Sequence, residues 1–365
     1  MPLLVKDQRQ QALFPDSATK LPPLPTLDVQ TDIKYYGTRA RTILNRPEAT
    51  GMDFWSINPY IGCALGCTYC YARYAHGYAF DRAARANPDH AQVAADVASL
   101  PEWLAFERRI LVKENGAAVL QKTLRTGSDR HLALIAGETI TIGTATDPYQ
   151  PAERRFRITR QILQVIAEHP GLDCRIITKS PLVTRDIDVL TRINRHSRIH
   201  VHVSLISADR ELARRIEPRA PTPDARLRAV KRLRDAGIDV GVNVMPILPG
   251  ITDGPAQLDR LVREIAAAGA THIAACALRL RHSARKRYLP WIAEEFPHLA
   301  ERYAQTYANS FHAGENYQDG LHQVMTRLCR RYRIKYGRYD SDEDVELSEA
   351  SEAAADQLGL PLLAG

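Results

Sequence analysis

Short apolar runs alternate with longer amphipathic stretches between residues 56 and 277. Each run has the length and β-branched content of a buried strand, and the stretches between them repeat their apolar residues with the period of a helix. Parallel strands need a long crossover, usually a helix, to return the chain to the same edge of a sheet. The pattern therefore predicts an α/β fold built from repeated strand–helix units.

Six strands are expected, and six such units suggest a partial (β/α)6 TIM-like barrel with a helical C-terminal extension. The strands are predicted at 56–62, 139–145, 174–178, 199–204, 240–245 and 272–277. Helices are predicted at 158–167, 227–236 and 256–268, with an added helix at 117–124. Gly237 and Gly269 follow two of them, and glycine is the usual left-handed stop after a helix. Functional residues of such barrels lie at the carboxyl ends of the strands.

Three cysteines follow the first predicted strand in the spacing CxxxCxxC: Cys63, Cys67 and Cys70. Three thiolates on one short loop can hold three irons of a [4Fe-4S] cluster, which leaves the fourth iron open to a small molecule. An alternative is a zinc site in which His76 supplies the fourth ligand. That spacing fits zinc less well, because zinc sites usually pair CxxC with a second pair of ligands further along the chain.

The composition is that of an ordinary globular protein, with 45% hydrophobic residues among 365. No apolar run approaches the ~18 residues that span a membrane, so no membrane association is expected. Three isolated cysteines, Cys174, Cys276 and Cys329, are expected to be buried thiols. Unpaired thiols suit a reducing compartment, which predicts a cytoplasmic location.

Charge is unevenly distributed along the chain. Residues 340–365 contain eight acidic side chains and no Lys or Arg, so residues 1–339 carry all 49 basic side chains against 34 acidic ones, a net charge of +15. A body this basic attracts polyanions, although a basic surface without a function is an equally good interpretation. Residues 327–339 interleave basic and tyrosine side chains, which suits either nucleic-acid binding or packing of a basic helix on the barrel.

Four segments are expected along the chain. Residues 1–33 are rich in proline and predict a flexible arm. The barrel core is expected at 34–281 and a basic helical extension at 282–339. Residues 340–365 form the acidic tail. The oligomeric state is left open.

The cysteine loop resembles that of the radical S-adenosylmethionine (radical SAM) enzymes. The resemblance implies that S-adenosylmethionine occupies the fourth iron, and that its reductive cleavage yields a 5'-deoxyadenosyl radical that abstracts a substrate hydrogen. It also implies that Tyr69, just before the third cysteine, lies beside the adenine. An electron donor such as flavodoxin or ferredoxin is a further implied partner.

Residues 56–250 resemble one branch of that family, spore photoproduct lyase and its DNA-repair photolyase-like relatives. The segments that carry this likeness are 67–71, 144–147, 177–179, 203–204, 216–218, 226–237 and 242–247. In that branch a lysine and a serine at two strand ends contact S-adenosylmethionine, and Lys179 and Ser204 stand at those positions. Met245 is expected to offer backbone contacts to the adenine.

One position departs from the branch. Spore photoproduct lyase returns a hydrogen atom from a cysteine just after the second strand, where this chain has Thr144. A threonine O–H bond is too strong for that role, whereas Tyr71 could donate a hydrogen atom as tyrosines do in radical relays. The likeness is therefore greater to uncharacterised bacterial relatives that share the sequence 146–151.

The motif at 146–153 allows two interpretations. Thr146, Asp147 and Glu153 could lie at the rim of the site and bind the cofactor or the substrate, or the motif could be a rigid turn that caps the next helix. The substrate is expected to be a nucleic acid, with a peptide or small metabolite as the first alternative. A non-enzymatic Cys3His metal-binding module is the second.

Overall fold

The computed structural model describes residues 26–30, 32–50, 52–73, 76, 91–125, 127–280 and 282–337. The acidic tail and most of the predicted arm lie outside these residues. The chain divides into two compact units. The first comprises Met1–Gly66 and Ala72–His200, and the second comprises Cys67–Tyr71 and Val201–Gly365.

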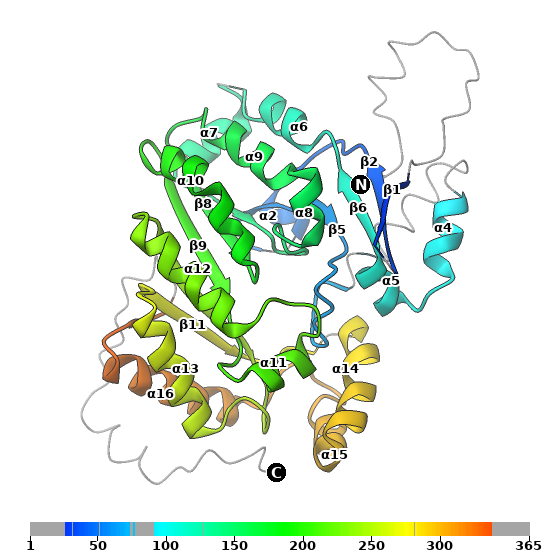
Figure 1. Cartoon of the computed structure of the whole chain (residues 1–365), viewed down its shortest axis with the longest axis vertical. Helices are drawn as coiled ribbons and strands as arrows, with labels where there is room; N and C mark the ends of the chain where they lie inside the picture. The colour runs from blue at the N-terminus through cyan, green and yellow to red at the C-terminus, as the bar shows by residue number, and fades with distance from the viewer. Residues whose placement is uncertain are drawn as a thin grey trace. The chain divides into compact units, whose positions relative to one another are not determined.

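Parallel strand–helix units build most of the first unit. Its strands β3 (Leu44–Asn45), β4 (Trp55–Ile57), β7 (Thr139–Ile142) and β8 (Asp173–Thr178) are neighbours in that order, and β4, β7 and β8 run parallel. Helices α9 (Ile158–Ile166) and α10 (Ile187–Asn194) lie along β8 in Figure 1. Ile162 and Leu163 of α9 are fully buried, because the apolar positions of that helix share one face.

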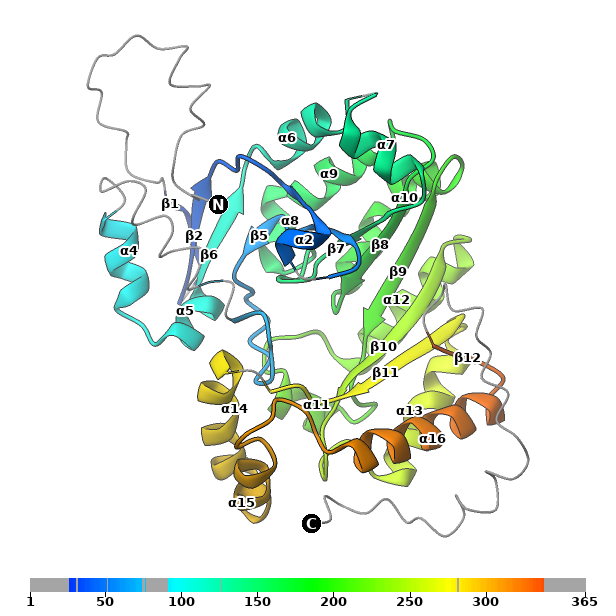
Figure 2. The same cartoon turned by 180° about the vertical axis from the view of Figure 1, so that it is seen from behind.

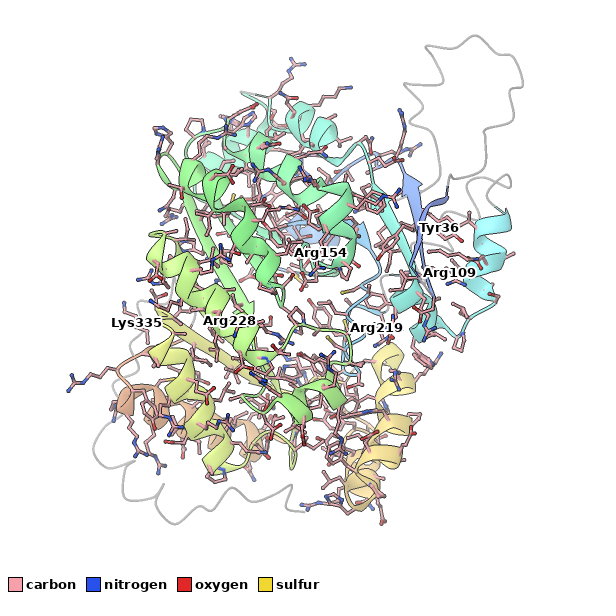
Figure 3. The ribbon with its side chains drawn as sticks, viewed as in Figure 1. Tyr36, Arg109, Arg154, Arg219, Arg228 and Lys335 are labelled. Atoms are coloured by element: carbon pink, nitrogen blue, oxygen red, sulfur yellow. The ribbon has the colours of Figure 1, made fainter. Side chains whose placement is uncertain are left out.

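A second sheet in the first unit was not predicted. Its order is β1 (Thr26–Gln30), β2 (Ile33–Thr38), β6 (Arg109–Lys113) and β5 (Tyr60–Ile61). Helices α4 (Ala91–Ala98) and α5 (Glu102–Arg108) lie beside it in Figures 1 and 2. Asp96 of α4 accepts hydrogen bonds from Lys34, Tyr36 and Arg109, the last two of which are labelled in Figure 3.

This sheet changes two expectations. We expected residues 1–33 to be a flexible arm, but residues 26–30 of that stretch form strand β1. The backbone of β1 pairs with β2 in an antiparallel hairpin. The strand predicted at 56–62 is two strands, β4 and β5, which belong to different sheets.

The second unit continues the strand–helix pattern. Strand β9 (Arg198–Ser204) crosses from the first unit into the second, where β10 (Asp239–Ile247), β11 (His272–Ala277) and β12 (Lys335–Tyr336) follow in order, the last three running parallel. Gly237 and Gly269 have φ of +77° and +83°, which confirms both predicted helix stops. In Figure 2, α13 (Pro255–Ala267) and α16 (Glu315–Arg331) lie beside β11.

The predicted fold class is confirmed: the chain has an α/β fold of parallel strand–helix units with a helical C-terminal part. The remaining helices are α2 (Pro47–Thr50), α6 (Gly116–Thr123), α7 (Asp129–Ile135), α8 (Pro151–Phe156), η2 (Pro181–Asp186), α11 (Arg210–Ile216), α12 (Pro223–Asp235), α14 (His282–Glu295) and α15 (Pro297–Thr306). Among the described residues, no helix is long and apolar enough to cross a membrane.

Candidate functional site

Two side chains of the 146–151 motif hold the backbone at the start of the cysteine loop. The carbonyl oxygen of Gly62 accepts a hydrogen bond from Thr146 Oγ1 at 2.6 Å and another from Gln150 Nε2 at 3.1 Å. The side-chain oxygen of Gln150 in turn accepts one from the backbone nitrogen of Ala64 at 3.0 Å. The backbone is thus fixed on both sides of Cys63. Thr146 supports the loop, and its contact with the cofactor stays a prediction.

Gly62 allows the close approach of α5 and β6 to the loop. Its φ is +84°, and a Cβ at this position would lie 2.8 Å from the carbonyl oxygen of Phe106 and 2.9 Å from Ile110 Cδ1. That carbonyl also accepts a hydrogen bond from the backbone nitrogen of Cys63 at 2.9 Å. A larger residue would therefore displace the backbone that carries the first cysteine.

We expect Gly62→Ala to destabilise the fold by about 2–4 kcal/mol, because it adds a steric clash to the cost of a left-handed alanine. Gly127→Ala is the matched control, since Gly127 has φ of +79° but its Cβ would meet none of the described residues within 4 Å. Urea denaturation of both variants separates the clash from the backbone cost. Equal losses in the two variants would show that α5 and β6 do not approach Gly62 tightly.

Asp147 connects the same motif to the end of β8. Its carboxylate accepts hydrogen bonds from Thr178 Oγ1 and the Lys179 backbone nitrogen, both at 2.7 Å, and from the Tyr149 backbone nitrogen at 2.8 Å. Burial raises the pKa of Asp147, while these hydrogen bonds and the Lys179 charge oppose the rise. Asp147 therefore fixes the backbone that presents Lys179. It does not cap α8, whose N-cap residue is Gln150.

Glu153 does not lie on the rim of the site, so that interpretation was wrong. Its side chain is fully buried and accepts hydrogen bonds from Tyr60 at 2.5 Å and from the Thr159 backbone nitrogen at 2.9 Å. Arg185 pairs with the same carboxylate at 2.7 Å. These contacts explain why a carboxylate can be buried here, and they leave it a structural role.

Thr144 lies at the end of β7 and contacts the residue that follows β4. Asn58 Nδ2 donates to Thr144 Oγ1 at 3.1 Å, and Asn58 Oδ1 accepts from the backbone nitrogen of Ala145 at 2.8 Å. Both side chains are buried. The predicted position of the missing hydrogen donor is therefore part of an ordered polar contact between two strand ends.

A buried ion pair in the second unit holds the middle of the cysteine loop. Tyr69 donates its hydroxyl hydrogen to Glu217, and Arg226 pairs with the other oxygen of that carboxylate. Arg226 also donates to the carbonyl oxygen of Ser204 at 3.0 Å, at the end of β9. Burial and the Glu217 charge raise the pKa of Tyr69 well above its ordinary value, so the phenol stays protonated.

Two other residues predicted to contact the cofactor, Ser204 and Met245, lie at or near the ends of β9 and β10. The side chain of Ser204 is buried at the end of β9, and Met245 lies near the end of β10. Tyr71 is 41% exposed, so its ring is accessible directly beside the last cysteine of the loop. These positions are compatible with the predicted cofactor contacts of Ser204 and Met245, which stay predictions.

The donor set suits an iron-sulfur cluster better than a single metal ion. None of the six cysteines forms a disulfide, and Cys63 and Cys67 are buried while Cys70 is partly exposed. Among the described residues, no three His, Cys, Asp or Glu side chains converge to bind one ion. A cluster has no such requirement, because each thiolate binds a different iron. Three thiolates on one short loop are the donor set that the implied cluster takes.

His76 is buried, and one of its two ring nitrogens contacts the backbone. Its Nε2 lies 2.8 Å from the carbonyl oxygen of Arg109, and burial lowers its pKa to about 4.

The other three cysteines are buried or nearly so, as predicted. Burial raises the pKa of Cys174 and Cys276, and it raises that of Cys329 to about 12.

The basic extension uses part of its aromatic content for packing. The Tyr332 hydroxyl lies 2.9 Å from the Asp259 carboxylate on α13, and the Tyr336 ring lies against His322 of α16. Arg331 also pairs with Asp259 at 3.1 Å. These contacts favour the interpretation in which the tyrosines of residues 327–337 pack on the fold, although the helix itself ends at Arg331 and β12 follows.

Comparison with known proteins decides the family. The family model described as "Radical SAM superfamily" matches residues 57–262, more than half of the chain. The chain belongs to the radical SAM superfamily. An uncharacterised protein of Mycobacterium tuberculosis is 34% identical over 83% of this chain and 82% of its own length. An uncharacterised protein of Methanocaldococcus jannaschii is 28% identical over 62% of this chain and 72% of its own length.

Solved structures of spore photoproduct lyase share the fold. A mutant of that enzyme aligns with a TM-score of 0.56 at 16% identity, over 83% of this chain and 80% of its own. Its complex with a dinucleoside spore photoproduct aligns with a TM-score of 0.55, also at 16% identity, over the same shares of the two chains. The predicted superfamily, fold and cofactors are thus confirmed: this radical SAM chain is an enzyme of a family that uses a [4Fe-4S] cluster and S-adenosylmethionine. A non-enzymatic Cys3His module is excluded.

Sequence reasoning missed the residues that hold the loop. Gln150, Glu217 and Arg226 lie inside segments that carried the family likeness, but no role was assigned to their side chains. The signal available was an amide or carboxylate side chain directly before a proline, at Gln150-Pro151 before α8 and at Glu217-Pro218 between α11 and α12.

Proposed function

We propose that Cys63, Cys67 and Cys70 hold the [4Fe-4S] cluster, and that Tyr69, Lys179 and Ser204 contact S-adenosylmethionine. The observation that carries this proposal is the CxxxCxxC loop, which lies within the family match at residues 57–262. Hydrogen bonds from Thr146 and to Gln150 hold the backbone on both sides of its first cysteine. When bound, the two cofactors supply the one-electron chemistry that removes a hydrogen atom from the substrate.

The protein's own residues orient these groups. Thr146 and Gln150 fix the backbone around the first cysteine, and Glu217 fixes the ring of Tyr69. Asp147 fixes the backbone of Lys179, whose ammonium group suits the carboxylate of the methionine moiety. Thr146, Asp147 and Met245 are further candidates for cofactor contacts, and Tyr71 is the candidate hydrogen donor in place of Thr144.

A nucleic acid is the proposed substrate. Two observations support this class: the net charge of +15 over residues 1–339, and the shared fold with an enzyme solved in complex with a dinucleoside photoproduct. A peptide or a small metabolite is the alternative substrate. We also propose a one-electron donor such as flavodoxin or ferredoxin, and a cytoplasmic location, which six cysteines without a disulfide support.

Binding to DNA or RNA should depend steeply on salt. Each neutralised phosphate releases counterions, so we expect a short single-stranded oligonucleotide to lose about tenfold or more in affinity between about 50 and 200 mM salt. Fluorescence anisotropy with a labelled oligonucleotide measures this directly. Failure to bind in low salt would reject the nucleic-acid substrate and leave the radical chemistry intact.

A further inference from the structure

A lysine that the predicted mechanism does not use is buried at the carboxyl end of β6. Lys113 is 7% exposed, and its Nζ donates to the carbonyl oxygen of Asn58 at 2.8 Å. No described carboxylate pairs with it, and burial alone lowers its pKa to about 8. An ammonium group carries three donors, so the chain satisfies only one of them among the described residues.

A second buried polar group faces the same way. Thr38 ends β2 and is the register partner of Lys113 in the parallel pair of β2 and β6, which places both side chains on one face of that sheet. Thr38 is 1% exposed, and its Oγ1 has no hydrogen-bond partner among the described residues. Buried hydroxyl groups and ammonium groups in such a state are rare in folded proteins, because desolvation without a partner is costly.

These two donors adjoin the strand ends that carry the site. Asn58, which binds Lys113 through its carbonyl oxygen, binds Thr144 and Ala145 through its side chain. Gly62, whose carbonyl oxygen is held by Thr146, lies only four residues after Asn58. Lys113 and Thr38 therefore lie in the same unit as the first cysteine and at the carboxyl ends of β2 and β6.

We propose that Lys113 and Thr38 form a subsite for an anionic phosphate oxygen of the substrate, on the side of the site bounded by Asn58 and Thr144. An ammonium group and a hydroxyl group can both donate a hydrogen bond to a phosphodiester oxygen, and lysine binds phosphate as a point charge. This inference deepens the proposed nucleic-acid function and rests on it. A bound phosphate would supply the negative charge that none of the described residues places beside Lys113.

The variant Lys113→Met should fold. The pKa of Lys113 is about 8 in the folded protein, below its ordinary value of 10.5, so folding disfavours the protonated form of this side chain. Its burial therefore costs stability below pH 8, and the cost fades between pH 8 and 10.5 as the unfolded chain also loses its proton. Thermal unfolding at neutral pH should give the methionine variant a midpoint equal to or above that of the wild type.

The test uses reconstituted full-length protein and three probes: dimethyl phosphate, acetate and a short single-stranded oligonucleotide. Lys113→Met should lower the affinity for the oligonucleotide by about ten- to a hundredfold, as expected for one hydrogen bond to a charged group. It should also reduce the salt slope by about one phosphate contact. Thr38→Val should weaken binding in the same direction, whereas Lys122→Met, at an exposed lysine of α6, should have no more than a small effect.

Dimethyl phosphate should compete with the oligonucleotide in the wild type but not in Lys113→Met, and acetate should compete poorly with both. Equal oligonucleotide affinities for the wild type and a folded Lys113→Met variant would overturn the subsite. Equal losses for Lys113→Met and Lys122→Met would overturn it as well. If the wild type binds dimethyl phosphate through Lys113 but binds no oligonucleotide, the subsite stands and the proposed substrate class fails.

Discussion

Replacing any one of Cys63, Cys67 and Cys70 with alanine should reduce the formation of 5'-deoxyadenosine to the level of a blank without enzyme. In the proposed site each thiolate would hold one iron, so a cluster with only two protein ligands would lose both its stability and the defined open iron. The measurement is 5'-deoxyadenosine by liquid chromatography after anaerobic reconstitution, together with the iron content of each variant.

Cys329→Ala is the matched control for these variants. Cys329 lies on α16, is 1% exposed, and is held as a thiol by burial, which raises its pKa to about 12. We expect this variant to keep the iron content and the 5'-deoxyadenosine yield of the wild type. Wild-type activity in Cys63→Ala, Cys67→Ala or Cys70→Ala would contradict the assignment of that cysteine as a ligand.

Arg226→Met should destabilise the protein by about 3–5 kcal/mol. Arg226 and Glu217 are 1% exposed or less, and removing the guanidinium group leaves the Glu217 carboxylate buried without its counter-charge. The hydroxyl of Tyr69 would remain its main donor among the described residues. Urea denaturation followed by circular dichroism measures the loss.

Arg228→Met provides the comparison, because Arg228 is exposed on the same helix, α12, and is labelled in Figure 3. A surface substitution of this kind changes stability by no more than about 0.5 kcal/mol. The variant Arg226→Met should also bind S-adenosylmethionine more weakly, since Glu217 positions Tyr69. A loss below about 1 kcal/mol for Arg226→Met would show that the buried ion pair is not needed to hold the loop.

The strand–helix units could be predicted because each depends on a local pattern. Strands β7, β8, β9, β10 and β11 and the helices between them follow apolar periods within a few residues of the expected bounds. The sheet of β1, β2, β6 and β5 could not, since β2 pairs with a strand 75 residues away, as in the register pair Thr38 and Lys113. No local period encodes such a pairing.

The site shows the same division. The spacing of the three cysteines indicates a cluster because all three ligands lie on one short segment of the chain, so the pattern is visible in the sequence. The hydrogen bond of Gln150 to Ala64 spans 86 residues, and that of Tyr69 to Glu217 spans 148. A carboxylate such as Glu153 also looks the same in sequence whether it is buried with Arg185 or exposed on a rim. Its burial became evident only from the packing of α8.

Anaerobic reconstitution of the wild type, followed by reduction with dithionite in the presence of S-adenosylmethionine, tests the radical chemistry most directly. We expect about four irons per chain, broad absorption near ~400 nm and release of 5'-deoxyadenosine. Uptake of one zinc ion per chain, without that absorption and without 5'-deoxyadenosine, would contradict it.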